Sequence, residues 1–325
     1  MSEQRAKSNI KKSLAFYTCV ISILLILATF TGCGAKTEDN GKLNIVATTT
    51  MLYDLTSIIG GDNVEVVGLM GVGIDPHLYK ASAGDVDKMN NADVVVYNGI
   101  HLEGQMGEIF ENLDKQDKSV ICIEKGINPS DIQADPLSPD SNDPHIWFDV
   151  TIWMQAATHV ANSLSEIDPD NAELYQSNLS AYMTELEELD GYITGRVAEV
   201  AQNQRVLITA HDAFNYFGSA YSFEVKGLQG ISTETEAGTG DVSELATFIA
   251  DNKIKAIFVE SSVPVKNIEA LQAAVKALGF DVAIGGELYS DSLGDASTGH
   301  DSYIATCKAN VDTIVDALKD TQGSN

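Results

Sequence analysis

The chain has 325 residues, of which 44% are hydrophobic and 21% are charged, and its formal net charge is −27 at pH 7. This length can bury the core of one large domain or of two medium domains. The negative charge argues against nucleic acid and other polyanions as partners, and it mildly favours the attraction of cations. A solvated acidic surface without any binding role is the simpler interpretation of the same charge.

The N-terminus has the layout of an export signal. Lys7, Lys11 and Lys12 precede an uncharged, largely apolar run over residues 13–32, which ends immediately before Cys33. A basic flank, an apolar run and small residues in this order are typical of a secretory signal. The run is also nearly long enough to span a bilayer, so an uncleaved anchor is the alternative.

The end of this run, "FTGC", resembles a bacterial lipoprotein signal, although Phe30 stands where leucine is usual. We therefore predict a lipoprotein signal peptide over residues 1–32, with Cys33 as the lipidated first residue of the mature protein. The small polar residues 33–41 are expected to form a flexible tether. Either interpretation places the folded part outside the cytoplasm.

Residues 42–167 read as alternating strands and helices. Apolar, β-branched runs predict strands, and the segments between them have helical character. The predicted strands are residues 43–50, 64–70, 93–99 and 119–126, and the predicted helices are residues 51–61, 82–92 and 106–115. Buried strands separated by helices indicate a parallel sheet that is covered on both faces.

Residues 205–325 repeat this alternation. The predicted strands begin at residues 205, 223, 254 and 281, and the predicted helices cover residues 241–252 and 265–279. The segments "VEVVGLMG" (64–71) and "FEVKGLQG" (223–230) share five of eight residues at equal spacing. This echo indicates a duplicated lobe.

A long helical segment over residues 168–204 separates the two sets. Apolar residues recur at roughly helical spacing, Pro169 suits a first helical turn, and Asp168 or Asp170 can cap the start. About 30 helical residues would measure about 45 Å at 1.5 Å per residue. Such a stiff connection predicts limited rotation of the lobes.

The predicted fold class is therefore α/β, with two pseudo-symmetric lobes. Each lobe is a mainly parallel sheet flanked by helices, and one long backbone helix joins them. The expected divisions are an N-terminal lobe over 42–167, a linking helix over 168–204 and a C-terminal lobe over 205–325. Export permits a disulfide between Cys122 and Cys307, but their apolar settings favour two buried thiols.

Four side chains with metal-binding chemistry occupy loops or strand ends. His77 and His145 each follow an Asp-Pro pair, in "DPHLY" and "DPHIWFD", while His211 ends a predicted strand and Asp291 follows another. In open α/β sheets, ligands bind at the carboxyl ends of the strands, and a crevice between two lobes is the expected site.

Three imidazoles and one carboxylate would suit a closed tetrahedral Zn²⁺ site, or Mn²⁺ if the carboxylate binds through both oxygens. The proline before His77 and before His145 fixes the backbone and would aim each ring. Taken alone, however, each histidine is more often a structural or surface residue. No short-spaced motif such as HExxH is present, so spacing alone leaves the ligand set open.

Together, several motifs resemble one family of binding proteins over residues 42–320. The motifs are "DPHLY", "DPHIWFD", "TAHDAFNYF", "GLQGISTETEAG", "IFVESS" and "ELYSDSLG". They look like the cluster A-I (cluster nine) solute-binding lipoproteins, the TroA-like zinc and manganese receptors of ABC transporters. The resemblance implies two α/β lobes joined by a long helix, and it implies His77, His145, His211 and Asp291 as metal ligands.

Two details bear on the metal that this resemblance implies. Manganese-type relatives often carry glutamate at the third ligand position, where this chain has His211. Strict zinc receptors tend to carry a histidine-rich loop before the second ligand, whereas residues 133–143 are acidic and contain no histidine. The expected cargo is therefore Zn²⁺ or Mn²⁺.

The function implied by the resemblance is capture and delivery, without catalysis. The expected protein is lipid-anchored to the outer face of the cytoplasmic membrane, is a monomer, and hands its cation to an ABC permease and its ATPase. The alternatives are an extracytoplasmic zinc hydrolase with Glu260 or Asp149 as base, and a surface adhesin on the same scaffold. An iron or chelate receptor is weaker, because no Tyr or Arg cluster presents itself.

The remaining polar residues receive simpler interpretations. His101 is expected to lie near the crevice or to be structural, and His159 and His300 are expected to face solvent. Asp149 either orients His145 or caps the next helix, with capping favoured. Glu260 either supports a ligand or is a buried, hydrogen-bonded acid.

Overall fold

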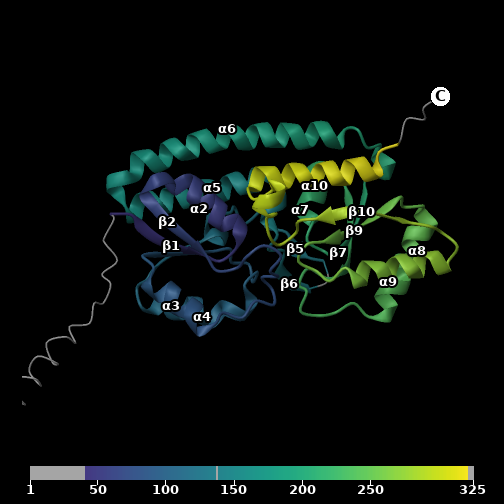
Figure 1. The fold of residues 1–325 in the computed structure, drawn as a ribbon, viewed down its shortest axis with the longest axis horizontal. Coiled ribbons are helices and arrows are strands. Elements are labelled where there is room, and N and C mark those ends of the chain that lie inside the picture. The colour runs from purple at the N-terminus through teal and green to yellow at the C-terminus, as the bar shows by residue number, and fades with distance from the viewer. Residues whose placement is uncertain (1–40, 137, 321–325) are drawn as a thin grey trace, which may run out of the picture. The chain divides into compact units, whose positions relative to one another are not determined.

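The computed structural model describes residues 41–136 and 138–320, which form two α/β lobes (Figure 1). The predicted signal peptide, Cys33 and most of the predicted tether lie outside these residues. In the N-terminal lobe, four parallel strands pair in the order β2-β1-β3-β4. These strands are β1 (Leu43–Ala47), β2 (Val64–Gly68), β3 (Val94–Tyr97) and β4 (Ser119–Cys122).

Three of the four helices of this lobe, α2, α3 and α5, begin at side chains that satisfy free backbone N–H groups. They are α2 (Thr50–Gly60), α3 (Ala83–Asn91), α4 (Gly107–Lys115) and α5 (Val150–Ile167). Thr49 caps α2, Ser82 and Asp85 form a capping box on α3, and Asp149 caps α5 by accepting from the N–H of Thr151. The predicted capping role of Asp149 is thus confirmed.

Two details of the predicted N-terminal lobe are wrong. The predicted strand over 119–126 ends at Cys122, and Ile123–Gly126 form a 3-10 turn. The acidic segment 133–143 is not a plain loop, because β5 (Ala134–Asp135) and β6 (Ser138–Asn142) pair antiparallel within it. A two-residue strand is too short to be read from alternation in a polar sequence.

The C-terminal lobe repeats the strand arrangement of the first. Its strands are β7 (Val206–His211), β8 (Glu224–Gln229), β9 (Ala256–Glu260) and β10 (Ala283–Leu288). β7 pairs with β8 and β9 with β10, all parallel, and β7 contacts β9. The spatial order β8-β7-β9-β10 therefore matches β2-β1-β3-β4. The echoing segments form β2 and β8, which hold equivalent places, so the prediction of pseudo-symmetric lobes is confirmed.

The helices of the second lobe are α7 (Asn215–Tyr221), α8 (Thr239–Asn252), α9 (Lys266–Ala277) and α10 (Tyr303–Leu318). Short 3-10 turns complete the connections; they are Gly61–Asn63, Gly104–Met106, Ile123–Gly126, Ile146–Phe148, Pro169–Asn171, Gln202–Gln204 and Ala296–Thr298. Among the described residues, Cys122 and Cys307 are not joined by a disulfide.

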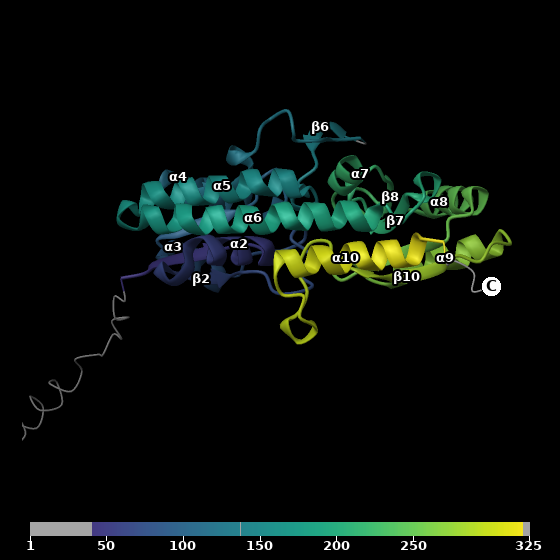
Figure 2. The same ribbon diagram turned by 90° about the horizontal axis from the view of Figure 1, so that it is seen from above.

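The long helix α6 (Ala172–Val197) has 26 residues and packs on α2, α5 and α10. Figures 1 and 2 show α6 running along both lobes, with α10 beside its C-terminal half. The predicted helix is confirmed, but the predicted caps are wrong. Pro169 lies in a preceding 3-10 turn, and Asp168 accepts hydrogen bonds from the Asn171 amide and the Tyr175 hydroxyl instead.

A continuous apolar core ties the helices to both sheets. Trp153, Tyr175 and Tyr182 are almost fully buried, and the Trp153 ring stacks on Tyr303 of α10 at a centroid distance of 4.9 Å. Because α10 contacts both β10 and α6, the chain after residue 205 also packs on the helical layer of the first lobe. We retain 42–167, 168–204 and 205–325 as a proposed division.

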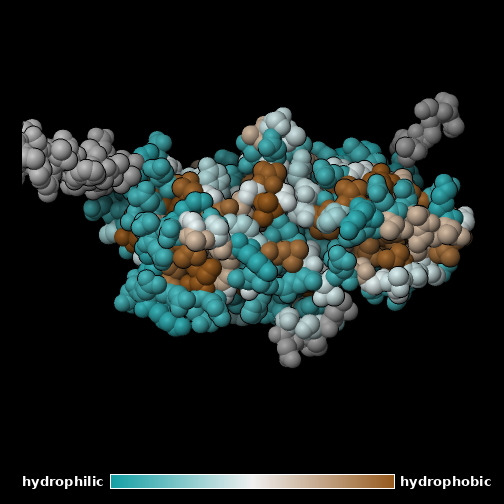
Figure 3. Space-filling view, turned by 60° about the horizontal axis from the view of Figure 1, so that its bottom comes forward, coloured by the Kyte–Doolittle hydropathy of each residue, from teal (hydrophilic) through white to brown (hydrophobic). Residues whose placement is uncertain are grey.

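The surface and the helices also bear on the sequence-based expectations. On the face in Figure 3, hydrophilic residues surround several separate apolar patches. Within residues 41–136 and 138–320, every helix is too short or too polar to cross a bilayer.

Candidate metal centre

The four side chains singled out in the sequence converge on one buried point. One ligand atom from each of His77, His145, His211 and Asp291 lies within 4.8 Å of the others. The Nε2 atom of His145 is 3.3 Å from that of His77 and 3.4 Å from that of His211. Asp291 Oδ1 is 3.4 Å from the Nε2 atoms of both His145 and His211. Each lobe contributes two of these groups, and all four are buried.

The Asp-Pro-His segments build two similar turns. Asp75 Oδ1 accepts the backbone N–H of His77 at 2.9 Å, and Asp143 Oδ1 accepts the backbone N–H of His145 at 2.9 Å. An aspartate that bonds the backbone two residues ahead closes an Asx turn. In each motif the proline restricts the backbone and the aspartate locks the turn, so the ring is aimed with little freedom left. We foresaw the role of proline but missed that of Asp75 and Asp143.

His145 is held through its second ring nitrogen as well. Its Nδ1 lies 2.7 Å from Asp143 Oδ1, and Asp143 Oδ2 accepts from the Asn215 amide at 3.1 Å. The Tyr216 hydroxyl donates to the backbone carbonyl of Asp143 at 2.9 Å. A carboxylate on Nδ1 turns Nε2 toward a metal and raises its basicity as a ligand. Trp147 packs edge-on against the ring, with centroids 5.3 Å apart.

His211 receives the same support from a neighbouring strand. It ends β7, and Glu260 ends the adjacent β9, so the carboxyl ends of two strands bring the residues together. His211 Nδ1 lies 2.6 Å from Glu260 Oε2, and its backbone N–H donates to Glu260 Oε1 at 2.8 Å. Glu260 thus supports a candidate ligand, which was one of its two predicted roles.

Asp291 lies in the loop after β10 and carries an incompletely satisfied buried oxygen. Its Oδ2 accepts the Ser262 hydroxyl at 2.9 Å. Its Oδ1 is buried and has no hydrogen-bond partner among the described residues; the two Nε2 atoms at 3.4 Å are within ion-pair reach but are too distant for a good hydrogen bond. Leaving such an oxygen unpaired is costly, and a cation held between these groups would satisfy it.

The rings differ in protonation. Burial, with the nearby charges of His145 and His211, lowers the pKa of His77 to about 3. Burial also acts to lower the pKa of His145, but the charge of Asp143 and the contacts with Asp143 and Asp291 outweigh it and raise the value to about 9. The charges of Glu260 and Asp291 likewise outweigh burial and raise the pKa of His211 well above its ordinary value.

The positive rings act in turn on Asp291. Burial alone would raise its pKa, but the charge of His211 and the contact with His145 hold that pKa well below the ordinary value. At neutral pH, protons on two rings therefore occupy the place that a divalent cation would take. Exchange of two protons for one such cation leaves the charge of the buried site unchanged.

The remaining histidines do not join this cluster. His101 is exposed and shares a cavity with His77, so it lies near the crevice, as one of its two interpretations expected. His159 and His300 are partly buried, so the expectation that they face solvent is only partly met. The His159 side chain packs against Gly126, where an added Cβ atom would lie 2.2 Å from the His159 Cβ, and His300 Nδ1 lies 3.2 Å from the Tyr289 hydroxyl.

The donor set fits a divalent transition metal. Three imidazole nitrogens and one carboxylate can complete a tetrahedral zinc sphere, and a carboxylate bound through both oxygens would suit manganese. Four protein donors leave no vacant position for water, which catalytic zinc requires.

Comparisons with known proteins agree with this geometry. Residues 45–317 match the family described as zinc-uptake complex component A, periplasmic. The zinc-binding protein TroA of Treponema pallidum is 44% identical, covering 92% of this chain and 97% of TroA. The solved structure of periplasmic TroA superposes with a TM-score of 0.83, covering 86% of this chain and 100% of that one at 45% identity.

Two further relatives differ in the metal for which they are named. The manganese-binding lipoprotein MntA of Bacillus subtilis is 41% identical, covering 91% of this chain and 97% of MntA. The iron ABC transporter substrate-binding lipoprotein MtsA of Streptococcus pyogenes serotype M6 is 32% identical, covering 95% of this chain and 99% of MtsA. The chain belongs to the family of the periplasmic zinc-uptake complex component A, within the cluster A-I metal-binding receptors.

Proposed function

We propose that this protein is an extracytoplasmic receptor that binds Zn²⁺ or Mn²⁺ between its lobes and delivers it to an ABC permease and its ATPase. His77, His145, His211 and Asp291 are the proposed ligands. The observation that carries this proposal is their convergence from both lobes on one point, where Asp291 Oδ1 is buried without a hydrogen bond. The names of the relatives support the class of cargo.

Delivery requires the lobes to separate, since each lobe holds half of the ligand set. Polar contacts cross the interface near the site. The Thr233 hydroxyl donates to Asp75 Oδ2 at 2.6 Å, and the backbone N–H of Gly73 donates to the Ser292 hydroxyl at 2.8 Å. Such hydrogen bonds each contribute only about 1 kcal/mol, because water replaces them on opening. The cation, bound by both lobes, would add a tie at the site itself, beyond the apolar core that the lobes share.

The attachment and partners follow from the predicted signal and from the family. We propose that Cys33 carries the lipid, which anchors the protein to the outer face of the cytoplasmic membrane as a monomer. MntA and MtsA are both named as lipoproteins, and MtsA is named as part of an ABC transporter. These names support an exported receptor with a membrane permease as its partner.

The hydrolase alternative is not favoured by the placement of its proposed bases. Glu260 is engaged by the ring and the backbone N–H of His211, behind the proposed metal position. Asp149 caps α5 through Thr151. Neither acid is placed to activate a water at a vacant metal position. The same donor set is closed to substrate, so binding without catalysis is the function that we propose.

Calorimetric titration of the metal-free protein with Zn²⁺, and separately with Mn²⁺, tests the proposal. Wild-type protein should bind one ion per chain. Asp291→Ala should weaken binding by about 100-fold or more, since removal of a supporting residue alone typically costs 10–100-fold. Asp251→Ala, which removes an exposed acid on α8, is the control and should bind like wild type. Wild-type affinity in Asp291→Ala would exclude the proposed ligand set.

A further inference from the structure

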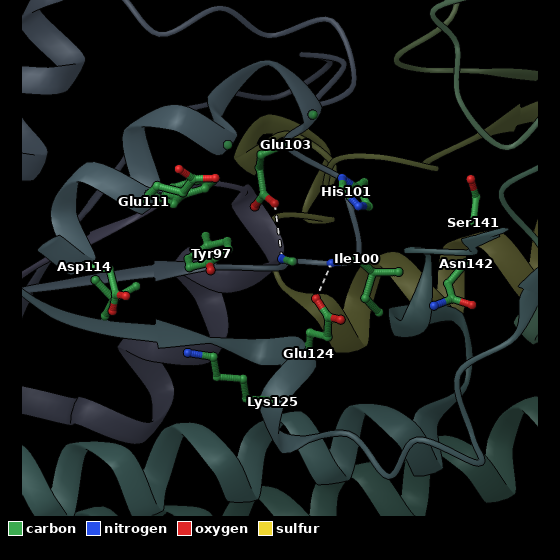
Figure 4. A pocket seen from close by; sticks show the side chains of 15 residues that line it. Tyr97, Ile100, His101, Glu103, Glu111, Asp114, Glu124, Lys125, Ser141 and Asn142 are labelled. Carbon is green, nitrogen blue, oxygen red and sulfur yellow. Dashed lines mark hydrogen bonds between the residues drawn. The ribbon is translucent and has the colours of Figure 1, made fainter.

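Two adjoining cavities lead toward one of the four proposed ligands. The inner cavity has a volume of about 290 Å³ and the outer one about 370 Å³. They share five lining residues, which are Ile100, His101, Gly104, Ser141 and Asn142. This common wall makes the two cavities neighbours, and residues of loop 99–101 line both. Figure 4 shows His101 on this loop, with Ser141 and Asn142 on the neighbouring segment.

The inner cavity reaches the proposed metal centre at His77. Of the four proposed ligands, His77 alone lines this cavity. Its side chain is buried, and no acid among the described residues contacts its Nδ1. The inner cavity therefore reaches the one ring whose Nδ1 is not bonded to a carboxylate. It does so although the two lobes are in contact with each other.

Loop 99–101 is held in a strained conformation. Gly99, Ile100 and His101 have φ values of 80°, 51° and 58°. A β-branched residue such as Ile100 at positive φ is a genuine outlier, and such strain costs about 1–3 kcal/mol and gathers at functional sites. Glu124 Oε2 accepts the N–H of Ile100 at 2.8 Å (Figure 4), and Glu103 Oε2 accepts that of Gly99 at 3.3 Å. Two acids thus fix the loop that carries His101 in both cavities.

Acidic side chains line both cavities. Glu103, Glu111, Asp114 and Glu124 line the outer cavity, where Lys125 is the one basic residue of the lining apart from His101. Asp135 and Glu234 line the inner cavity, with no lysine or arginine in its lining. A cleft lined by charge of one sign focuses the field and raises the local concentration of counter-ions.

Glu234 also joins the two lobes beside His101. The Gln105 amide donates to Glu234 Oε1 at 2.6 Å, from the segment that follows loop 99–101. The other oxygen, Oε2, has no hydrogen-bond partner among the described residues. An imidazole and a carboxylate oxygen in one cavity are ligand types that divalent transition metals accept.

We propose that the two cavities are the entry path for the cation, and that His101 and Glu234 are transient ligands that pass a hydrated Zn²⁺ or Mn²⁺ to His77. This inference rests on the proposed function. A transient ligand lowers the barrier between the free and the bound ion in both directions. Removal of such a ligand therefore slows association and dissociation by the same factor.

Stopped-flow fluorescence tests the proposal, with Trp147 beside His145 as the natural reporter. The metal-free protein is mixed with zinc chloride alone, and dissociation is followed with excess chelator. We compare His101→Gln and Glu234→Gln with Glu236→Gln, which neutralises an exposed acid of the same loop outside both cavities. Glutamine at 234 keeps the acceptor for Gln105 and removes the charge.

The expected result is a parallel fall of both rate constants by about fivefold or more in His101→Gln and in Glu234→Gln, within the range of electrostatic steering effects. Glu236→Gln should keep wild-type rates. Unchanged rates in both test variants, or an equal fall in Glu236→Gln, would overturn the entry path. So would faster dissociation at an unchanged association rate. Failure of the wild-type protein to bind either Zn²⁺ or Mn²⁺ at equilibrium would instead reject the proposed receptor function.

Discussion

Three histidines converge on the proposed metal position, but they are supported in different ways. His145 and His211 each have a buried acid on Nδ1, Asp143 and Glu260 respectively. His77 has no such partner among the described residues and faces the inner cavity. The difference indicates two roles within the proposed ligand set. The two rings with an acid on Nδ1 are held in place and protonated. The unsupported ring is neutral, so it can accept an arriving cation first.

The largest effect expected from this comparison is on the pH dependence of metal affinity, because the rings differ in whether they carry a proton. His145, with its pKa raised to about 9, and His211, with its pKa raised well above its ordinary value, carry protons at neutral pH that a metal must displace. His77, with its pKa lowered to about 3, has none to lose. Below about pH 9, metal affinity should therefore fall by about 100-fold for each unit of pH lost, because two protons compete with the ion.

Calorimetry at pH 7.5 in two buffers of different ionisation enthalpy measures this exchange directly. We expect about two protons released per Zn²⁺ bound. Release of three protons would mean that His77 is protonated like the other rings. Release of none would remove the distinction between the supported and the unsupported rings altogether.

Replacement of the supporting acids should produce the next largest effect. Glu260→Gln and Asp143→Asn keep the size of each side chain but lose the charge that orients the ring and stabilises its Nδ1–H, so Zn²⁺ affinity should fall by about 10–100-fold each. Asp75→Asn is the matched variant on His77. Its amide oxygen can still accept the N–H of His77, and no ring contact is lost, so affinity should change by no more than about threefold.

Competition with a chromophoric zinc chelator measures all three variants under one condition. Equal losses in Asp75→Asn and Asp143→Asn would show that the two Asx turns matter more than the acid on the ring. The supported and the unsupported rings would then be equivalent in binding.

Sequence patterns pointed to the proposed ligands better than to their supports. The Asp-Pro-His echo and the strand ends drew attention to His77, His145, His211 and Asp291, because these positions are fixed by local turns and by the carboxyl ends of strands, and the family resemblance implied them as one set. The pairing of His211 with Glu260 depends on β7 lying next to β9. This contact between strands brings together two residues that are 49 positions apart in the sequence, and a local sequence pattern cannot predict it.

The same limit applies to the fold. Apolar runs located the four parallel strands of each lobe, and helical periodicity located the long helix, since burial of one helix face repeats regularly along the chain. These patterns could not predict the two-residue strand β5, or the start of α6, where Asn171 takes the capping position without a side-chain bond. They also could not predict the two cavities, which are defined by loops from both lobes.

The smallest effect concerns a partly buried acid that has no ring as its partner, which extends the comparison from rings to acids. Asp54 on α2 accepts the N–H of Tyr303 at the start of α10, at 2.9 Å. Burial raises its pKa from 3.8 to about 6, and the nearby charge of Asp301 adds to this. The folded state binds this proton more tightly than the unfolded state, so its stabilising effect is full below about pH 3.8 and is lost as pH rises through about 6.

Asp54→Asn should therefore raise the free energy of unfolding at pH 7.5 by about 1–2 kcal/mol, because the charge that resists burial is gone while the amide oxygen still accepts from Tyr303. The gain should vanish near pH 4, where wild-type Asp54 is itself protonated. Urea unfolding of the metal-free protein at both pH values measures it, with Asp251→Asn on exposed α8 as the control. A loss of stability at pH 7.5 would show that the hydrogen bond from Tyr303 stabilises the ionised Asp54 by more than burial destabilises it. An ionised acid could then be stable at such a position without an imidazole as its partner.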